Sequence, residues 1–292
     1  MKIAVFTNLY KNHSSKVLHS IIEKLQKNSF EILIDKESSD LLKNRKNSSI
    51  LNKLKIFTKI DKTFNYIICI GGDGTILKAV SYVKNIGIPI IGINTGRLGF
   101  LAKIKAIEID NVISAIIGKR YKISERSLIT ISYTNNNKIK KLGEALNEVS
   151  ITRKNTTSLI TIEIKLNDEY LNTYWADGLI ISTPTGSTGY SLSCGGPIIM
   201  PESKNLVITP IAPHNLNARP LVIPDNTNIS LKVSGRENEF FMSLDSKITT
   251  LNNELIISIK KASYKIKMIQ LDNDNFLQTL RDKLYWGKDR RN

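Results

Sequence analysis

Hydrophobic residues in the first third of the chain alternate between two spacings. Short apolar runs typical of buried strands lie at Lys2 to Asn8, Phe30 to Asp35, Tyr66 to Ile70 and Ile88 to Asn94. Between them, apolar residues recur with helical spacing, at 17 to 25, 76 to 83 and 107 to 117. Strands that are flanked by helices and apolar on both faces predict a parallel, doubly wound α/β sheet. The polar stretch from Lys36 to about Leu54 predicts a surface loop with a short helix.

The pattern changes near Gly118. From Tyr121 onward, runs such as SLITISYT, LITIEIKL and NISLKVS alternate apolar and polar residues, which is typical of antiparallel strands. The segment from Asn275 to Trp286 returns to helical spacing. We therefore predict an α/β domain over residues 1–118, followed by an all-β domain of packed antiparallel sheets that ends before this helical segment.

Composition narrows the class of protein. The 292 residues carry a net charge of +16, but the lysines are spread along the chain and form no basic stripe. This distribution argues against a nucleic-acid partner and allows at most the attraction of a polyanionic small molecule. Two cysteines cannot form a disulfide framework, and no stretch is long enough to span a bilayer. We expect a cytoplasmic protein with no membrane partner.

A glycine-rich turn follows the third predicted strand. Gly71-Gly72-Asp73-Gly74 would lie at the carboxyl end of a parallel strand, where ligands gather, and would open a helix. Glycines there let backbone N–H groups approach a phosphate, whereas a carboxylate would repel it. Asp73 is therefore a candidate base, metal ligand or hydroxyl acceptor, and a plain helix N-cap is the alternative. The spacings of the Walker A and Rossmann motifs are both absent.

A second unusual stretch runs from Asp177 to Ile198. After a predicted strand it continues as STPTGSTGYSLSCGG, which supplies small hydroxyls and backbone amides that could wrap a polar ligand. Its serines do not fit the nucleophile-elbow spacing. A flexible surface loop is the alternative, although long polar loops in compact domains are usually functional.

These two stretches and three others make the chain similar to the bacterial NAD kinase family over nearly its whole length. The other three are GINTGRLGFLA (92–102), ALNEVSITR (145–153) and ITPIAPHNLNARPLVIP (208–224). The glycine turn alone is weak, because lipid kinases and phosphofructokinases carry it too. The Asn147-Glu148 pair followed by the long Thr/Ser/Gly loop is specific.

The resemblance implies an enzyme that transfers the γ-phosphate of ATP to the 2′-hydroxyl of the adenosine ribose of NAD, which gives NADP. It also implies a divalent cation, Mg²⁺ by expectation, held mainly by the ATP phosphates, and a homo-oligomer, dimer or tetramer. Residues 1–118 and 270–292 would then bind nucleotide, and residues 119–269 would bind NAD.

Residue by residue, the resemblance makes Asp73 the catalytic proton acceptor. The NAD-binding residues that it implies are Asp73, Gly74, Lys78, Phe100, Asn147, Glu148, Asp177, Thr188, Gly189, Tyr190, Ser191, Leu192, Ser193, Ala212 and Lys247. A solvated helix lysine is the alternative for Lys78. Ser158, Trp175 and Lys247 depart from the family pattern, which puts phosphate or inter-subunit contacts there in doubt.

Two other functions compete with this one. A lipid kinase of the diacylglycerol kinase type would share the glycine turn but would need an apolar acceptor cleft. A dinucleotide sensor without activity would lack the key carboxylate, whereas Asp73 is present.

Overall fold

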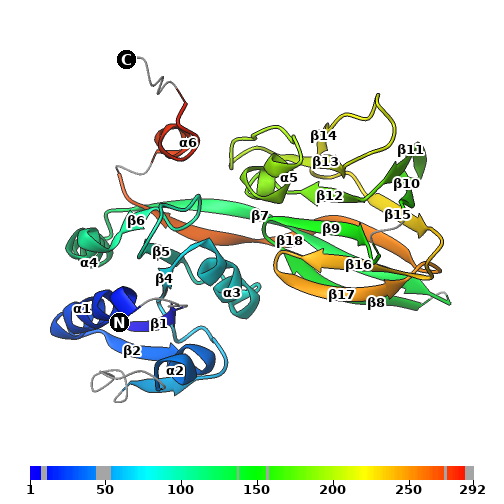
Figure 1. The fold of residues 1–292 in the computed structure, drawn as a ribbon. Helices are drawn as coiled ribbons and strands as arrows, with labels where there is room; N and C mark the ends of the chain where they lie inside the picture. The colour runs from blue at the N-terminus through cyan, green and yellow to red at the C-terminus, as the bar shows by residue number, and fades with distance from the viewer. Residues whose placement is uncertain (8–11, 44–53, 137, 156–157, 273–274, 287–292) are drawn as a thin grey trace. The chain divides into compact units, whose positions relative to one another are not determined.

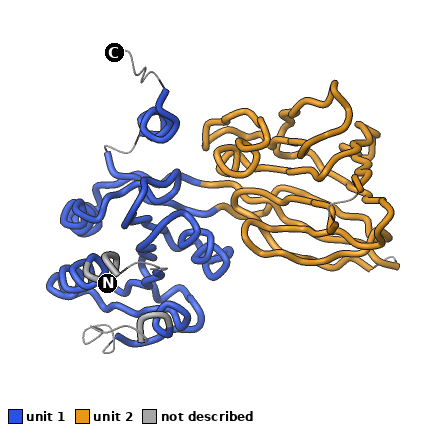
Figure 2. The backbone as a smooth tube through the Cα atoms, viewed as in Figure 1, with its two compact units in different colours: residues 1–125, 266–292 blue, residues 126–265 orange. Residues whose placement is uncertain are grey.

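The computed structural model describes residues 1–7, 12–43, 54–136, 138–155, 158–272 and 275–286. The chain divides into two compact units, one of residues 1–125 with 266–292 and one of residues 126–265 (Figure 2). These bounds lie a few residues from those of the predicted domains, whose assignment to nucleotide and NAD binding stays a prediction.

The first unit is built on a parallel sheet with the strand order β3-β2-β1-β4-β5, which the last part of β18 extends beside β5 (Figure 1). Its strands are β1 (Lys2–Thr7), β2 (Glu31–Asp35), β3 (Lys55–Phe57), β4 (Tyr66–Gly71), β5 (Ile90–Asn94) and β6 (Ile104–Lys105). Its helices are α1 (Asn12–Lys27), α2 (Lys36–Lys43), α3 (Asp73–Val83), η2 (Ala106–Glu108), α4 (Ile109–Gly118) and α6 (Phe276–Leu284).

Alternate residues of these strands pack against helices on opposite faces. Ile3 and Val5 of β1 join a core with Leu18 of α1 and Val112 of α4. Phe6, which points the other way, packs edge-on against Tyr82 of α3. Helices on both faces explain the nearly unbroken apolar runs of the strands, and they make the sheet doubly wound, as predicted.

The second unit consists of two antiparallel sheets packed face to face. One sheet has the order β14-β13-β12-β9-β16-β17, and the other contains β11-β10-β15-β18 with β7 and β8. The bounds are β7 (Lys122–Asn135), β8 (Lys138–Ala145), β9 (Glu148–Arg153), β10 (Ile160–Leu166), β11 (Glu169–Ala176), β12 (Gly178–Ser182), β13 (Asn205–Ile211), β14 (Leu221–Pro224), β15 (Ile229–Ser234), β16 (Glu239–Leu244), β17 (Lys247–Asn252) and β18 (Ile256–Gln270). A short 3-10 turn, η3 (Gly186–Thr188), and helix α5 (Tyr190–Ser193) follow β12.

The inward-facing residues of both sheets form one core. Ile151 and Phe240 of the first sheet pack with Ile162 and Leu231 of the second. This arrangement is the predicted all-β fold of packed sheets. Among the described residues, no helix combines the length and apolarity that crossing a membrane requires.

Candidate active site

The glycine turn lies where the sequence predicts it, at the carboxyl end of β4 and at the start of α3. Gly72 is the N-cap of α3, and Asp73 is therefore the first residue inside the helix. The alternative that Asp73 caps the helix is therefore wrong. Gly72 and Gly74, on either side of Asp73, are exposed, so the backbone here is open to a ligand.

The Asp73 carboxylate accepts hydrogen bonds from three successive backbone N–H groups. Phe100 N–H donates to Oδ2 over 2.9 Å, and the N–H groups of Leu101 and Ala102 donate to Oδ1 over 3.1 and 2.8 Å. Each carboxylate oxygen offers about two lone-pair sites, so capacity remains for a hydroxyl donor. Asp73 thus closes the loop after β5 against the start of α3.

Asn94 and Gly99, which are not among the residues predicted from the sequence, complete this loop. Asn94, at the end of β5, accepts from Gly96 N–H over 2.7 Å and donates to the Arg97 carbonyl over 2.5 Å. A Cβ atom added to Gly99 would lie 1.9 Å from Oδ1 of Asp73, so only glycine fits under the carboxylate. Both lie inside the quoted motif at 92–102, which is the signal that could have identified them.

Lys78 is paired with acidic side chains of the same unit. Its Nζ lies 2.6 Å from Oδ2 of Asp35, at the end of β2, and 3.1 Å from Oε2 of Glu37. Asp35 is fully buried, and Ser38 donates to it through both its backbone N–H and its hydroxyl. Burial lowers the pKa of Lys78, but the ion pairs outweigh that effect and raise it. A solvated lysine is therefore excluded, and a phosphate contact by Lys78 stays a prediction that must compete with two carboxylates.

Phe100, predicted to lie near the adenine, is partly exposed in the loop after β5. The Nζ of Lys283, from α6, lies 4.7 Å from the centroid of its ring. This cation–π contact ties the C-terminal helix to the loop that Asp73 holds.

The Asn147-Glu148 pair in the second unit is held by another carboxylate, Asp245. The backbone N–H groups of Leu146, Asn147 and Glu148 donate to Asp245 over 2.9, 2.8 and 3.2 Å. Asp245 N–H donates in return to the Glu148 carbonyl over 3.0 Å. Asp245 is not among the residues predicted from the sequence, although it lies two residues before Lys247 in SLDSK.

Glu148 carries a perturbed carboxyl group. Its Oε2 atom is buried and has no hydrogen-bond partner. Burial first and the charge of Asp245 second raise the pKa of Glu148 to about 7, against the opposing effect of the Tyr190 N–H. A Cβ atom on Gly189 would lie 3.0 Å from Oε2, so any side chain at this position would crowd the buried oxygen. Glu148 can therefore change its protonation state near neutral pH.

The hydroxyls of the long loop after β12 serve mainly to fold the loop. The buried ones are Thr183, Thr185, Ser187 and Ser191, together with Ser182 at the end of β12, each at most 7% exposed. Ser191 bonds to the Thr209 hydroxyl over 2.8 Å, and Ser187 accepts from Ile199 N–H over 3.0 Å. The expectation that these side chains offer their hydroxyls to a ligand is corrected for these five positions. Thr188, Tyr190 and Ser193 keep side chains that reach the surface, and Leu192 is partly buried.

The remaining predicted residues of the second unit lie on loops and strand ends. Asp177 forms an ion pair with Arg153, with Nε 3.0 Å from Oδ1. Ala212 has a φ of 43°, in the left-handed region that residues with a Cβ rarely adopt, which marks a locally constrained backbone. Lys247 begins β17 and is exposed, and Trp175 on β11 is 57% exposed.

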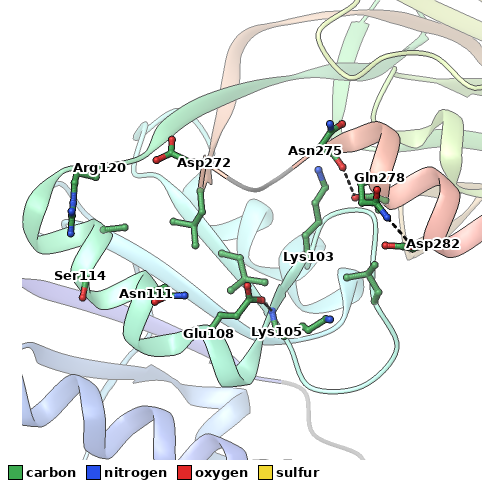
Figure 3. Close-up of a pocket in the computed structure, with 15 residues that line it drawn as sticks. Lys103, Lys105, Glu108, Asn111, Ser114, Arg120, Asp272, Asn275, Gln278 and Asp282 are labelled. Carbon is green, nitrogen blue, oxygen red and sulfur yellow. Dashed lines mark hydrogen bonds between the residues drawn. The ribbon is translucent and has the colours of Figure 1, made fainter.

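A cavity of about 390 Å³ lies in the first unit between α4 and α6. Figure 3 shows the side chains that line it. Basic Lys103, Lys105 and Arg120 line it together with acidic Glu108 and Asp272. Mixed charge selects no single class of ligand, and none of the predicted NAD-binding residues lines this cavity. Within the described part of the chain, no group of three or more His, Cys, Asp or Glu residues could hold a metal ion.

Comparisons with known proteins identify the family. The ATP-NAD kinase N-terminal domain matches residues 3–121, and the ATP-NAD kinase C-terminal domain matches residues 146–271. NAD kinases from Flavobacterium psychrophilum and Flavobacterium johnsoniae are 52% and 50% identical to the chain, each over 100% of both sequences. The chain therefore belongs to the NAD kinase family, whose members are phosphotransferases with an alcohol group as acceptor.

Solved structures share the fold. Yeast NADH kinase complexed with NADH superposes with a TM-score of 0.87 at 21% identity, covering 99% of this chain and 88% of that one. An NAD kinase from Archaeoglobus fulgidus in complex with ATP gives a TM-score of 0.72 at 22% identity, covering 98% of each chain. The two-part fold predicted from the sequence is thus the fold of NAD kinases.

Proposed function

We propose that this protein transfers the γ-phosphate of ATP to the 2′-hydroxyl of the adenosine ribose of NAD, with Asp73 as the proton acceptor. The observation that carries the proposal is the position of Asp73. Its carboxylate lies at the carboxyl end of a parallel strand, between exposed glycines, on a chain that is 52% identical to an NAD kinase over its full length.

A ribose hydroxyl is a poor nucleophile, and a carboxylate within hydrogen-bond reach can take its proton as the bond to phosphorus forms. The three backbone N–H groups fix the Asp73 side chain without using all of its lone pairs. Asn147 and Glu148 would bind the adenosine. Gly74, Lys78, Phe100, Asp177, Thr188 to Ser193, Ala212 and Lys247 remain proposed NAD contacts, with Ser191 limited to its backbone because its hydroxyl bonds to Thr209.

A divalent cation, Mg²⁺ by preference, would be carried by the ATP phosphates, as the resemblance to NAD kinases implies. When bound, it would neutralise charge on the phosphates. We further propose that the protein works in the cytoplasm as a homo-oligomer.

The test incubates the purified protein with ATP, Mg²⁺ and either NAD or diacylglycerol. We expect NADP from the first mixture and no phosphorylated lipid from the second. Product in the lipid mixture alone would overturn the proposal in favour of a lipid kinase, for which the comparisons give no support.

A further inference from the structure

Asp245 stands out among the carboxylates of the second unit because its side chain accepts hydrogen bonds from three successive backbone N–H groups of one short segment. It lies between β16 and β17 with a φ of 50°, in the left-handed region. It accepts from the backbone N–H groups of residues 146–148 and donates back to the carbonyl of Glu148. The Ser243 hydroxyl donates to the Asp245 carbonyl over 2.9 Å, which braces the turn.

Building on the proposed function, we propose that Asp245 is a positioning residue for NAD binding. Its carboxylate holds the backbone of residues 146–148 in the shape that receives the adenosine part of NAD, and its negative charge acts on the neighbouring Glu148 carboxyl.

Hydrogen bonding distinguishes the two carboxyl groups. Burial raises the pKa of Asp245 above its usual value, and three backbone N–H groups and the charge of Lys247 offset only part of that rise. Glu148 has a buried oxygen with no partner and faces the charge of Asp245, so its pKa rises to about 7. When two interacting carboxyl groups have unequal environments, their pKa values separate, so that one group is ionised while the other can hold a proton.

The groups that bear on Glu148 come from three elements. Asp245 acts from the β16–β17 turn, Lys247 at the start of β17 acts on Asp245, and the Tyr190 N–H at the start of α5 donates to the Glu148 carboxylate. Of these, only Asp245 both fixes the backbone of Glu148 and raises the pKa of its side chain. Removing its charge should therefore change the shape of the segment and the pH at which Glu148 titrates.

The first experiment measures hydrogen exchange at the amides of residues 146–148 in the full-length protein. Asp245→Asn should speed exchange there by a factor on the order of ten or more, since three hydrogen bonds weaken together. Asp225→Asn is the matched control, because Asp225 is a buried carboxylate of the same unit that is paired with Lys261 over 2.5 Å rather than with residues 146–148. Equal protection of these amides in both variants would overturn the positioning role.

The second experiment measures the dissociation constant of NAD by calorimetry between about pH 5.5 and 8.5. In the wild type the affinity should change near pH 7, and Glu148→Gln should remove that change. In Asp245→Asn the midpoint should move to lower pH by about one unit, because a nearby like charge is lost. An unmoved midpoint would show that Asp245 only stabilises the fold.

Asp245→Glu keeps the charge but lengthens the side chain, and it also serves if Asp245→Asn does not fold. It should speed amide exchange while leaving the midpoint near that of the wild type. Failure of the wild type to bind NAD would refute the proposed function, whereas the exchange experiment would still decide whether Asp245 holds the backbone of residues 146–148.

Discussion

Asp73 and Asp245 use the same hydrogen-bonding scheme in two different units. Each carboxylate accepts hydrogen bonds from three successive backbone N–H groups. The donors are residues 100–102 in the first unit and residues 146–148 in the second. Each therefore fixes a loop whose own peptide groups would otherwise lack partners. The scheme by itself does not distinguish a reactive carboxylate from a structural one.

The surroundings of the two carboxylates differ. Asp73 is flanked by exposed glycines. Gly99, which has no side chain, lies against the Oδ1 atom of Asp73. Asp245 is next to a second carboxyl group, Glu148, whose pKa it raises. The same scheme can thus present a carboxylate to a hydroxyl in one unit and tune a neighbouring acid in the other.

The largest expected effect is that of Asp73→Asn. The amide keeps the shape of the side chain but cannot accept the proton, so turnover should fall by a factor of roughly 10² to 10⁴. The affinity for NAD should change much less. Steady-state kinetics and NAD titration on the same variant provide the measurement, with thermal unfolding to check that the loop at 100–102 survives. Turnover close to that of the wild type would make Asp73 a loop clamp like Asp245.

A smaller effect is expected from Gly99→Ala. The new Cβ would lie 1.9 Å from Oδ1 and 2.7 Å from Cγ of Asp73, so the carboxylate must move. Overpacking of this kind costs about 2 kcal/mol in unfolding free energy, and turnover should fall by about tenfold. Gly96→Ala is the matched control in the same loop, because its Cβ would meet nothing within 4 Å. Equal turnover in the two variants would mean that the position of Asp73 does not limit the reaction.

The sequence predicted what periodicity and composition encode. The strands that contain Ile68 and Ile91 are uninterrupted apolar runs in the sequence, because helices cover both faces of their sheet. The strands of the second unit instead alternate apolar and polar residues. The position of Asp73 at a strand end followed from the parallel topology. These features depend on residues that are near one another along the chain.

The sequence could not predict contacts between distant segments. Asp245 forms hydrogen bonds with residues 146–148, which lie about a hundred positions earlier in the sequence. Lys78 forms a hydrogen bond with Asp35, which lies 43 positions earlier. Nothing local distinguishes such carboxylates from solvated ones. The buried hydroxyls of the loop after β12 were misleading for the same reason, since Ser191 finds its partner Thr209 on a strand that comes later in the chain. Burial, which decides whether a hydroxyl is free, is a property of the fold.

The smallest expected effect is a dependence of stability on pH that comes from the second unit. Glu148 has a pKa of about 7 when folded and an ordinary value of 4.5, so the folded state holds more protons between these two pH values. The stabilisation of the folded state that comes from protonated Glu148 is fully present below pH 4.5. It is lost as the pH rises through 7, so the unfolding free energy should fall between these two pH values. With a discount for partial exposure, the loss should be about 1 kcal/mol.

Urea unfolding at pH 5 and pH 8 measures this effect, with Glu148→Gln as the reference. The wild type should lose about 1 kcal/mol more between the two pH values than the variant, whose amide does not titrate. Asp245→Asn should lie between them, because burial still raises the pKa of Glu148 after the charge of Asp245 is gone. Identical pH dependence in the wild type and in Glu148→Gln would show that Glu148 is ionised throughout. The second unit would then hold two charged carboxylates side by side, and the contrast with the single carboxylate at Asp73 would have to rest on geometry alone.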